Sequence, residues 1–203
     1  MSPDRVRSRR GEGDRLREEI VEAATELLLK TDDAEAVTIR AVAKAVGVSP
    51  PSIYLHFADK TSLIVAVCQA TFDVLDEHIE RASAHVDDPL EAIVVRGRAY
   101  IEFGLDNPEH YRILFMTRKF VEELPPEELL KSAAFDHHHA AVERAAAAGK
   151  LREGLDPLLA AVGLWSAVHG ITSLLITKPN FPWPDREQLV EHVLDCGVRA
   201  ISR

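Results

Sequence analysis

The stretch TIRAVAKAVGVSPPSIYLHF, residues 38–57, decides how the first part of the chain folds. Counting from Ile39, a small residue stands fifth (Ala43), a glycine ninth (Gly47) and a branched apolar residue fifteenth (Ile53). Ala43 allows two helices to approach closely, Gly47 suits the positive φ of a tight turn, and Ile53 fills the space between the helices. The spacing predicts a helix-turn-helix over 38–57, although an ordinary corner of two helices has the same pattern.

Residues on either side extend this unit into a helical domain. Apolar residues recur at helical spacing over 14–30, with glutamates on the opposite face, which predicts an amphipathic helix. Thr38 is the expected N-cap of the second helix and Ser49 of the third. The two prolines after Ser49 fit a first helical turn, because the N–H groups they lack have no partner within the helix there.

The rest of the chain also has the pattern of helices, separated by short runs rich in Pro and Gly. No alternating strand pattern occurs, so the expected fold class is all-α. We expect a three-helix N-terminal domain joined by a long helix to a larger helical domain. The expected boundaries are a flexible basic arm at 1–13, the helix-turn-helix domain at 14–67 and the C-terminal domain at 68–203. In the C-terminal domain the expected helices cover 89–105, 108–118, 126–148, 156–177 and 185–201.

The charge of the chain is spread unevenly. Its 203 residues have a formal net charge of −9, yet residues 1–67 hold ten Lys and Arg against eleven Asp and Glu. Because a few well-placed cations decide contact with DNA, the acidic total does not exclude a nucleic-acid partner. Two isolated cysteines, and an Arg-rich N-terminus without the apolar core of a secretory signal, predict a cytoplasmic location.

The residues that follow the turn resemble a known family. Together with Gly47, the residues Tyr54, His56-Phe57 and Lys60 are similar to the tetracycline-repressor (TetR) family of bacterial transcription regulators, over about residues 15–75. In the C-terminal part, Trp165 to Gly170 looks like the subgroup with a Trp…His-Gly regulatory domain. The resemblance implies a two-fold homodimer that binds a double-stranded DNA operator. It also implies a C-terminal domain that binds a small-molecule effector and then releases DNA. Since the sequence has no nucleophile elbow, phosphate loop, paired acid–base set or thiolate cluster, neither enzymatic activity nor a cofactor is expected.

The resemblance also assigns roles to single residues. The third helix is expected to enter the major groove, while the start of the second helix and Lys60 contact phosphates. Tyr54 alternatively packs half-buried against the core. The arm, with arginines from Arg5 to Arg10, either enters a narrow minor groove or is a solvated tail. The residues expected to contact DNA are Thr38, Arg40, Ser49, Pro50, Pro51, Ser52, Tyr54, His56 and Lys60.

Aromatic residues on several C-terminal helices are candidates for an apolar effector pocket, although each fits a packed core as well. His169 either orients a polar group of a ligand or bonds a neighbouring group. The alternative function is a helical small-molecule-binding protein or enzyme that uses His169. The candidate pocket residues are Tyr100, Phe103, Tyr111, Phe115, Met116, Phe135, Trp165 and His169.

Three further patterns bear on partners. The run Asp136 to His139 suggests a metal, but adjacent helical residues point about 100° apart, so its three histidines cannot share one ion and no metal is expected. The uncharged stretch 158–176 has the length of a membrane span, yet it fits a buried or interfacial helix better and no membrane partner is expected. Homodimerisation is therefore expected through helices 156–177 and 185–201, as a four-helix bundle.

Overall fold

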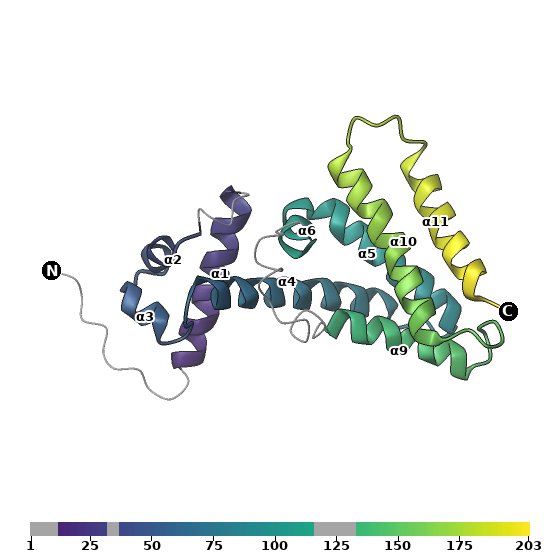
Figure 1. Cartoon of the computed structure of the whole chain (residues 1–203), viewed down its shortest axis with the longest axis horizontal. Helices are drawn as coiled ribbons and strands as arrows, with labels where there is room; N and C mark the ends of the chain where they lie inside the picture. The colour runs from purple at the N-terminus through teal and green to yellow at the C-terminus, as the bar shows by residue number, and fades with distance from the viewer. Residues whose placement is uncertain (1–11, 32–36, 116–132) are drawn as a thin grey trace. The chain divides into compact units, whose positions relative to one another are not determined.

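The computed structural model describes residues 12–31, 37–115 and 133–203 (Figure 1). Over these ranges the secondary structure is helical, apart from one isolated antiparallel bridge between Leu151 and Ser202, so the predicted all-α class is confirmed. The helices are α1 (Glu12–Thr31), α2 (Ile39–Val46), α3 (Pro50–Tyr54), α4 (Lys60–Ser83), α5 (Pro89–Asp106), α6 (Pro108–Phe115), α9 (Ala133–Ala147), α10 (Pro157–Thr177) and α11 (Arg186–Ile201).

The helix ends predicted from sequence lie within two residues of the observed ends of α1, α5, α10 and α11. The third predicted helix is shorter than expected, because α3 ends at Tyr54 rather than near Phe57. The backbone N–H groups of His56 and Phe57 both bond the carbonyl of Ile53, which closes a tight turn. The predicted arm up to residue 11 lies outside the described residues, as do 116–132, which include parts of two predicted helices.

The described chain divides into two compact units. The first unit holds residues up to Ala70 together with 113–115, and the second holds 71–112 and 133–203. Helix α4 contributes residues to both units, as does α6. The predicted domain boundary between residues 67 and 68 stays a prediction.

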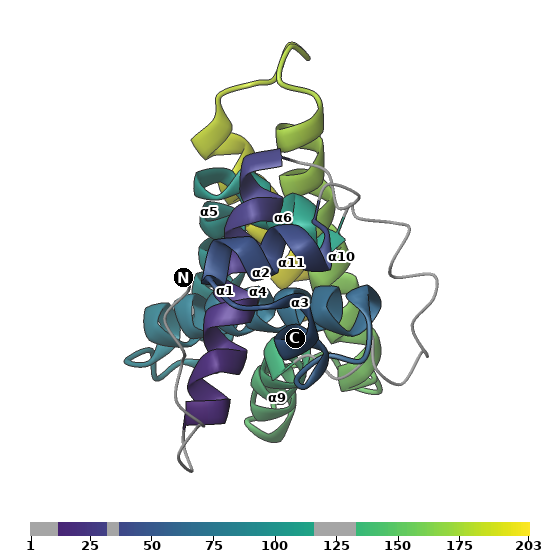
Figure 2. The same cartoon turned by 90° about the vertical axis from the view of Figure 1, so that its left-hand side faces the viewer.

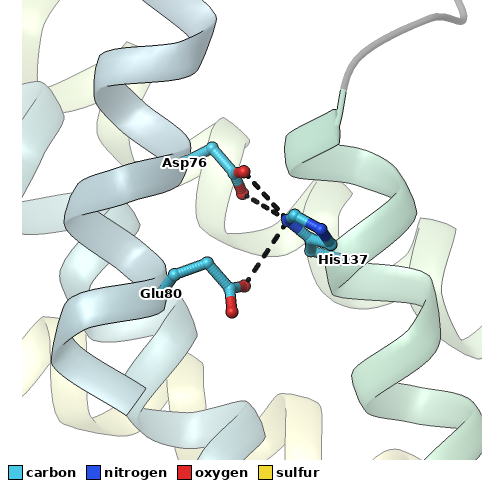
Figure 3. Close-up of side chains that lie close together, drawn as sticks. All are labelled: Asp76, Glu80 and His137. Carbon is cyan, nitrogen blue, oxygen red and sulfur yellow. Dashed lines mark hydrogen bonds and ion pairs between the residues drawn. The ribbon is translucent and has the colours of Figure 1, made fainter. Parts of the chain in front are cut away.

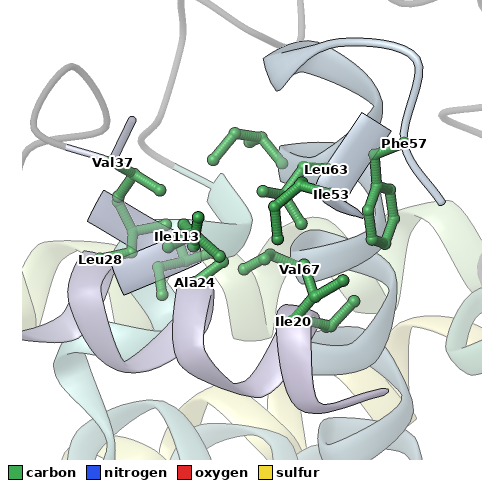
Figure 4. Packing of buried hydrophobic residues seen from close by; sticks show 13 residues of the cluster. Ile20, Ala24, Leu28, Val37, Ile53, Phe57, Leu63, Val67 and Ile113 are labelled. Atoms are coloured by element: carbon green, nitrogen blue, oxygen red, sulfur yellow. The ribbon is translucent and has the colours of Figure 1, made fainter. Parts of the chain in front are cut away.

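The core of the first unit is built from one apolar stripe on each of its helices (Figure 4). Ile20, Ala24 and Leu28 recur every fourth residue, so they lie on one side of α1 and are buried together. They share a cluster with Ile53 of α3 and Val67 of α4. Burying a side chain of this size stabilises the fold by about 1.5–3 kcal/mol, so this cluster fixes α3 against the other helices.

In the second unit, α5 contacts α9, α10 and α11, and α10 also contacts α9. Helices α10 and α11 lie side by side, joined by the loop 178–185 at the top of Figures 1 and 2. Asp88, Asp156 and Asp185 cap α5, α10 and α11, since each carboxylate accepts a hydrogen bond from a first-turn N–H. The ends of these helices are therefore set by local sequence signals.

A close approach of α5 to α10 depends on Gly104. A Cβ atom built on Gly104 would lie 2.4 Å from the Cγ2 atom of Thr172, which is fully buried, and 2.9 Å from the ring of Tyr111. Only a residue without a side chain fits between these neighbours. The crossing brings the side chains of Tyr100 and Tyr111 close to α10.

Candidate functional site

The start of α2 and the turn after it are held by short-range hydrogen bonds. The Thr38 hydroxyl accepts a bond from the N–H of Ala41 at 3.1 Å, which confirms Thr38 as the predicted cap. Gly47 has φ +78°, in the left-handed region that favours glycine, and its N–H and that of Val48 both bond the carbonyl of Ala43. The helix-turn-helix therefore has the turn that its sequence predicts.

Helix α3 begins differently from the prediction. Ser49 stands at the N-cap with extended backbone angles, but its side chain makes no capping bond to the backbone. Its hydroxyl instead lies 2.9 Å from the hydroxyl of Ser52. Pro50 and Pro51 have no N–H group, and the N–H of Ser52 bonds the backbone carbonyl of Ser49 rather than its hydroxyl. Two hydroxyls and two proline rings thus form the N-terminus of this helix.

Helix α3 and the turn after it place two large side chains in the core and two in solvent. Ile53 is 0% exposed and Phe57 is buried beside it, while the Tyr54 side chain is 55% exposed. Tyr54 therefore lies outside the buried core, and both its contact with DNA and its half-buried packing stay predictions. Leu55, which the sequence did not single out, is 84% exposed, so a large apolar side chain stands in solvent next to Tyr54.

Cations lie at two other places in the first unit. Arg40 and Lys44 are exposed on α2, and Lys60 begins α4. Asp59 caps α4 through a 2.7 Å bond from the N–H of Ser62, and hydrogen bonds from Ser62 lower the pKa of this carboxyl. The cap fixes the start of α4 and therefore the position of Lys60 at its first turn. Of the predicted DNA-contact residues, Thr38, Arg40, Ser49, Pro51 and Tyr54 are exposed, and Pro50, Ser52, His56 and Lys60 are partly buried.

In the second unit, a histidine of α10 joins two tyrosines. The hydroxyls of Tyr100 and Tyr111 lie 3.0 and 2.8 Å from Nδ1 of His169, and the Tyr111 hydroxyl also donates to the His169 carbonyl at 3.1 Å. Burial lowers the pKa of His169, raises the pKa of Tyr111 to about 12 and raises that of Tyr100 further still. All three side chains are therefore uncharged at neutral pH, which makes the cluster polar but not ionic.

Two larger rings continue from this histidine toward α9. Trp165 lies 5.8 Å from His169 between ring centroids, and Phe135 of α9 lies 5.8 Å from Trp165. Trp165 is 37% exposed, so the row of rings reaches the surface of the second unit. We call Tyr100, Tyr111, Phe135, Trp165 and His169 the aromatic cluster.

Of the other predicted pocket residues, Phe103 belongs to a different group of rings. Phe103 packs with His78 and His110 instead, at centroid distances of 5.7 and 6.4 Å. Phe115 belongs to the first unit, and Met116 lies outside the described residues. Five of the eight candidates thus form one row.

The three adjacent histidines of α9 point to separate partners, as the helical geometry requires. His137 Nδ1 lies 2.9 Å from a carboxylate oxygen of Asp76, and 3.8 Å from one of Glu80 (Figure 3). His138 Nε2 donates to the carbonyl of Ala161 at 3.0 Å, while His139 faces Glu143. Asp76 and Glu80 lie one turn apart on α4, and the sequence pattern around the histidines did not include them.

Asp76, Glu80 and His137 lie close enough together to hold a metal ion. Their nitrogen and oxygen donors would suit a divalent transition metal. However, the guanidinium of Arg96 bonds the same Glu80 oxygen at 2.5 Å, which places a fixed positive charge where an ion would bind. Hydrogen bonds and ion pairs account for the whole group, so it supports no metal site.

Helix α10 leaves an apolar face open on the second unit. It is long and apolar enough by length and composition to cross a membrane, with 33% of the apolar window buried inside the chain. Leu159 is 65% exposed and Val162 and Leu174 are also exposed. Cβ atoms built on Gly163 or Gly170 would meet nothing within 4 Å. By contrast, Val190, Leu194 and Ile201 of α11 are buried within the chain itself.

Comparisons with known proteins agree with this architecture. Residues 20–67 match the model of bacterial regulatory proteins of the tetR family, and residues 93–196 match that of the tetracyclin repressor-like C-terminal domain. The chain is 33% identical over 98 residues to the nucleoid occlusion factor SlmA of Vibrio campbellii, an alignment that covers 48% of this chain. The chain spans about half the length of that curated relative, since the alignment covers 50% of it.

Solved structures show the same fold. A protein of unknown function from Rhodococcus sp. RHA1 superposes over 100% of both chains, with a TM-score of 0.76 and 22% identity. The regulator FadR of Bacillus subtilis, solved in complex with stearoyl-CoA, superposes over 89% of this chain and 97% of its own, with a TM-score of 0.69 and 18% identity. At these identities the likeness describes the fold alone.

Proposed function

The chain belongs to the TetR family of DNA-binding transcription regulators, and from this premise we propose that it is a repressor released from a palindromic operator by a small, largely apolar effector. The observation that carries the proposal is that the two units present different kinds of chemical groups. The first unit presents a capped helix-turn-helix with exposed hydrogen-bonding groups. The second unit presents a row of uncharged aromatic side chains around His169.

The exposed side of α3 supports contact with DNA. With Ile53 and Phe57 anchored in the core, Tyr54 and the hydroxyl pair of Ser49 and Ser52 stand on a rigid support. The prolines carry no N–H for a phosphate, so they favour apolar contact with a thymine methyl. Few long hydrogen-bonding side chains face outward, so we assign much of the specificity to DNA shape.

The cations of the first unit support positioning on the DNA backbone. Arg40 near the start of α2 and Lys60 at the start of α4 each suit a phosphate contact, because helix N-termini and cations both attract anions. Such contacts fix the register of the protein on the duplex without reading sequence. The arginine-rich arm before α1 adds a sequence-independent contact in the same proposal.

The aromatic cluster supports the effector site. Aromatic walls with a small number of polar groups are typical of small-molecule sites. His169 and the two tyrosine hydroxyls supply the polar groups, while Trp165 and Phe135 supply apolar surface. An effector can shift the protein only if it binds the DNA-free state more tightly than the DNA-bound state.

The open face of α10 supports homodimerisation. Leu159, Val162, Gly163, Ser166 and Gly170 follow one side of the helix, where the small residues permit close approach of a second helix. We expect α10 of two protomers to meet along this side, with α11 beside them. A two-fold dimer would place its recognition helices about 34–36 Å apart, or somewhat more, on a palindromic site.

Proteins of this family act by binding, and the proposed location is the cytoplasm, where the operator is. The alternative remains a helical ligand-binding protein or enzyme that works through His169 alone. The repressor and this alternative require different residues for function, so point variants distinguish them.

The test compares three variants of the full chain for binding to an operator selected from random DNA. Tyr54→Ala and Lys60→Ala are expected to weaken binding, each by about 1–3 kcal/mol, while His169→Ala keeps DNA binding and loses the response to effector. Lys30→Ala is the matched control, because Lys30 is an exposed cation of the first unit that pairs with Glu26 on its own helix. The alternative is favoured if the first two variants are silent and only His169→Ala loses function.

A further inference from the structure

Arg96 of α5 is the one fully buried arginine among the described residues, since only 3% of it is exposed. Its Nη1 atom bonds the carboxylate of Glu80 at 2.5 Å and lies 3.2 Å from the hydroxyl of Ser83, both on α4. The Nε and Nη2 atoms are shielded from solvent and have no hydrogen-bond partner in the described part of the chain. The guanidinium is thus satisfied along one side and unsatisfied along the other.

The unsatisfied side is the one that recognises anions. Nε–H and the adjacent Nη2–H point the same way, so together they match the two oxygens of a carboxylate or a phosphate. Leaving such donors buried without a partner is costly, because they have lost water and gained no protein acceptor. A bound anion would restore the missing hydrogen bonds.

The position of Arg96 links this open edge to the aromatic cluster. Tyr100 follows one turn later on α5, so the two side chains lie on the same face of that helix. His138 of α9 is close enough for the positive charge of Arg96 to act on it: its pKa is lowered first by burial and further by that charge. The His138 ring in turn contacts the ring of Phe135, at 6.3 Å between centroids.

We infer that the effector is an amphipathic anion, whose carboxylate or phosphate head pairs with the Nε and Nη2 edge of Arg96 and whose apolar body lies along Phe135 and Trp165. This inference rests on the proposed function, since it gives the chemical class of the effector for that site. It adds a binding residue that the sequence pattern of aromatic side chains did not include.

The guanidinium of Arg96 would also couple binding of the anion to helix α4. Nη1 holds Glu80 and Ser83 of α4, while the opposite edge would hold the ligand. A ligand reaches that edge only by displacing the side chains that cover it. Arg96, which would bind the ligand, is itself hydrogen-bonded to α4. Binding of an anion is therefore felt by the helix that contributes to both units.

Three probes of equal chain length test the inference on the full protein: decanoate, decyl phosphate and decanol. Binding is measured by calorimetry without DNA. Wild type is expected to bind at least one of the two anions about tenfold or more tightly than decanol, as expected for charge-assisted hydrogen bonds. The two anions distinguish a carboxylate effector from a phosphate one.

Two variants locate the effect. Arg96→Lys keeps a cation for Glu80 but removes the two-donor edge, so the preference for the anion over decanol is expected to fall to about twofold or less. Arg98→Lys is the matched control, because Arg98 lies two residues away on α5, faces Glu191 and is partly exposed. It is expected to keep the full preference.

Equal binding of anions and decanol by wild type would overturn the inference, and so would binding of neither anion. An unchanged preference in Arg96→Lys would overturn it as well. The wild-type comparison does not depend on the folding of any variant. Because no DNA is present, a failure here leaves DNA binding intact as a separate result, and loss of DNA binding alone would refute the proposed function instead.

Discussion

Replacing Ile53 by alanine is expected to unfold the helix-turn-helix far more easily than replacing its near neighbour Leu55. Both side chains are large and apolar and lie in or just after α3, but Ile53 is 0% exposed and Leu55 is 84% exposed. The pair therefore compares the same kind of truncation inside and outside the core of the first unit.

The magnitude follows from the atoms removed. Ile53→Ala deletes three buried carbons, about 2.4 kcal/mol at roughly 0.8 kcal/mol per buried CH₂. The cavity left in the cluster adds to this, so we expect a loss of about 3–4 kcal/mol, within the range seen for such truncations. Leu55→Ala removes groups that already contact water, and its expected effect is within about 0.5 kcal/mol.

Urea unfolding followed by circular dichroism measures both variants, with binding to operator DNA as a second readout. Ile53→Ala is expected to lose DNA binding once the first unit is destabilised, and Leu55→Ala to keep its stability. If Ile53→Ala costs less than about 1 kcal/mol, or if the two variants are equally destabilised, the packing described for α3 is wrong.

Other expected outcomes concern DNA, assembly and pH. Lys60→Gln should lower the slope of log affinity against log salt by about one, as loss of one phosphate contact does; an unchanged slope removes Lys60 from the backbone contacts. Gly163→Leu, at a position where an added Cβ atom meets nothing within 4 Å in the chain itself, should convert the proposed dimer to monomer in sedimentation without lowering stability. A persistent dimer would exclude this face of α10. Burial lowers the pKa of His138 and His169 in the folded state, so the unfolded chain binds more protons below about pH 6.5. Urea unfolding should therefore show stability falling as the pH drops from 7 to 5, and His138→Gln should flatten that dependence.

Short-range signals in the sequence were enough to predict the first unit. Thr38 caps its own helix, Gly47 takes its own left-handed conformation, and Ile53 follows from a fixed spacing to both. Each of these features depends on residues a few positions away, so it can be recognised in a single sequence. The missing capping bond of Ser49 could not be predicted as simply, because the N–H of Ser52, which an N-cap hydroxyl commonly bonds, bonds the Ser49 carbonyl instead.

The second unit depends on pairings between distant residues, and prediction was correspondingly weaker. The aromatic residues were found by type, but their sorting into a cluster around His169 and a separate group around Phe103 depends on how α5, α6 and α10 cross. Arg96 did leave a signal. It occupies the buried face of α5, with Ala92 one turn before it and Tyr100 one turn after, where a charge is out of place without a partner.

The most direct test of the account is binding of the purified protein to its own upstream intergenic DNA, with competitor DNA, at two salt concentrations. We expect a complex at nanomolar protein that competitor DNA does not remove and that weakens steeply as the salt concentration rises. Absence of a specific complex there, and again after selection from random DNA, would contradict it and leave a helical ligand-binding protein whose helix-turn-helix no longer reads DNA.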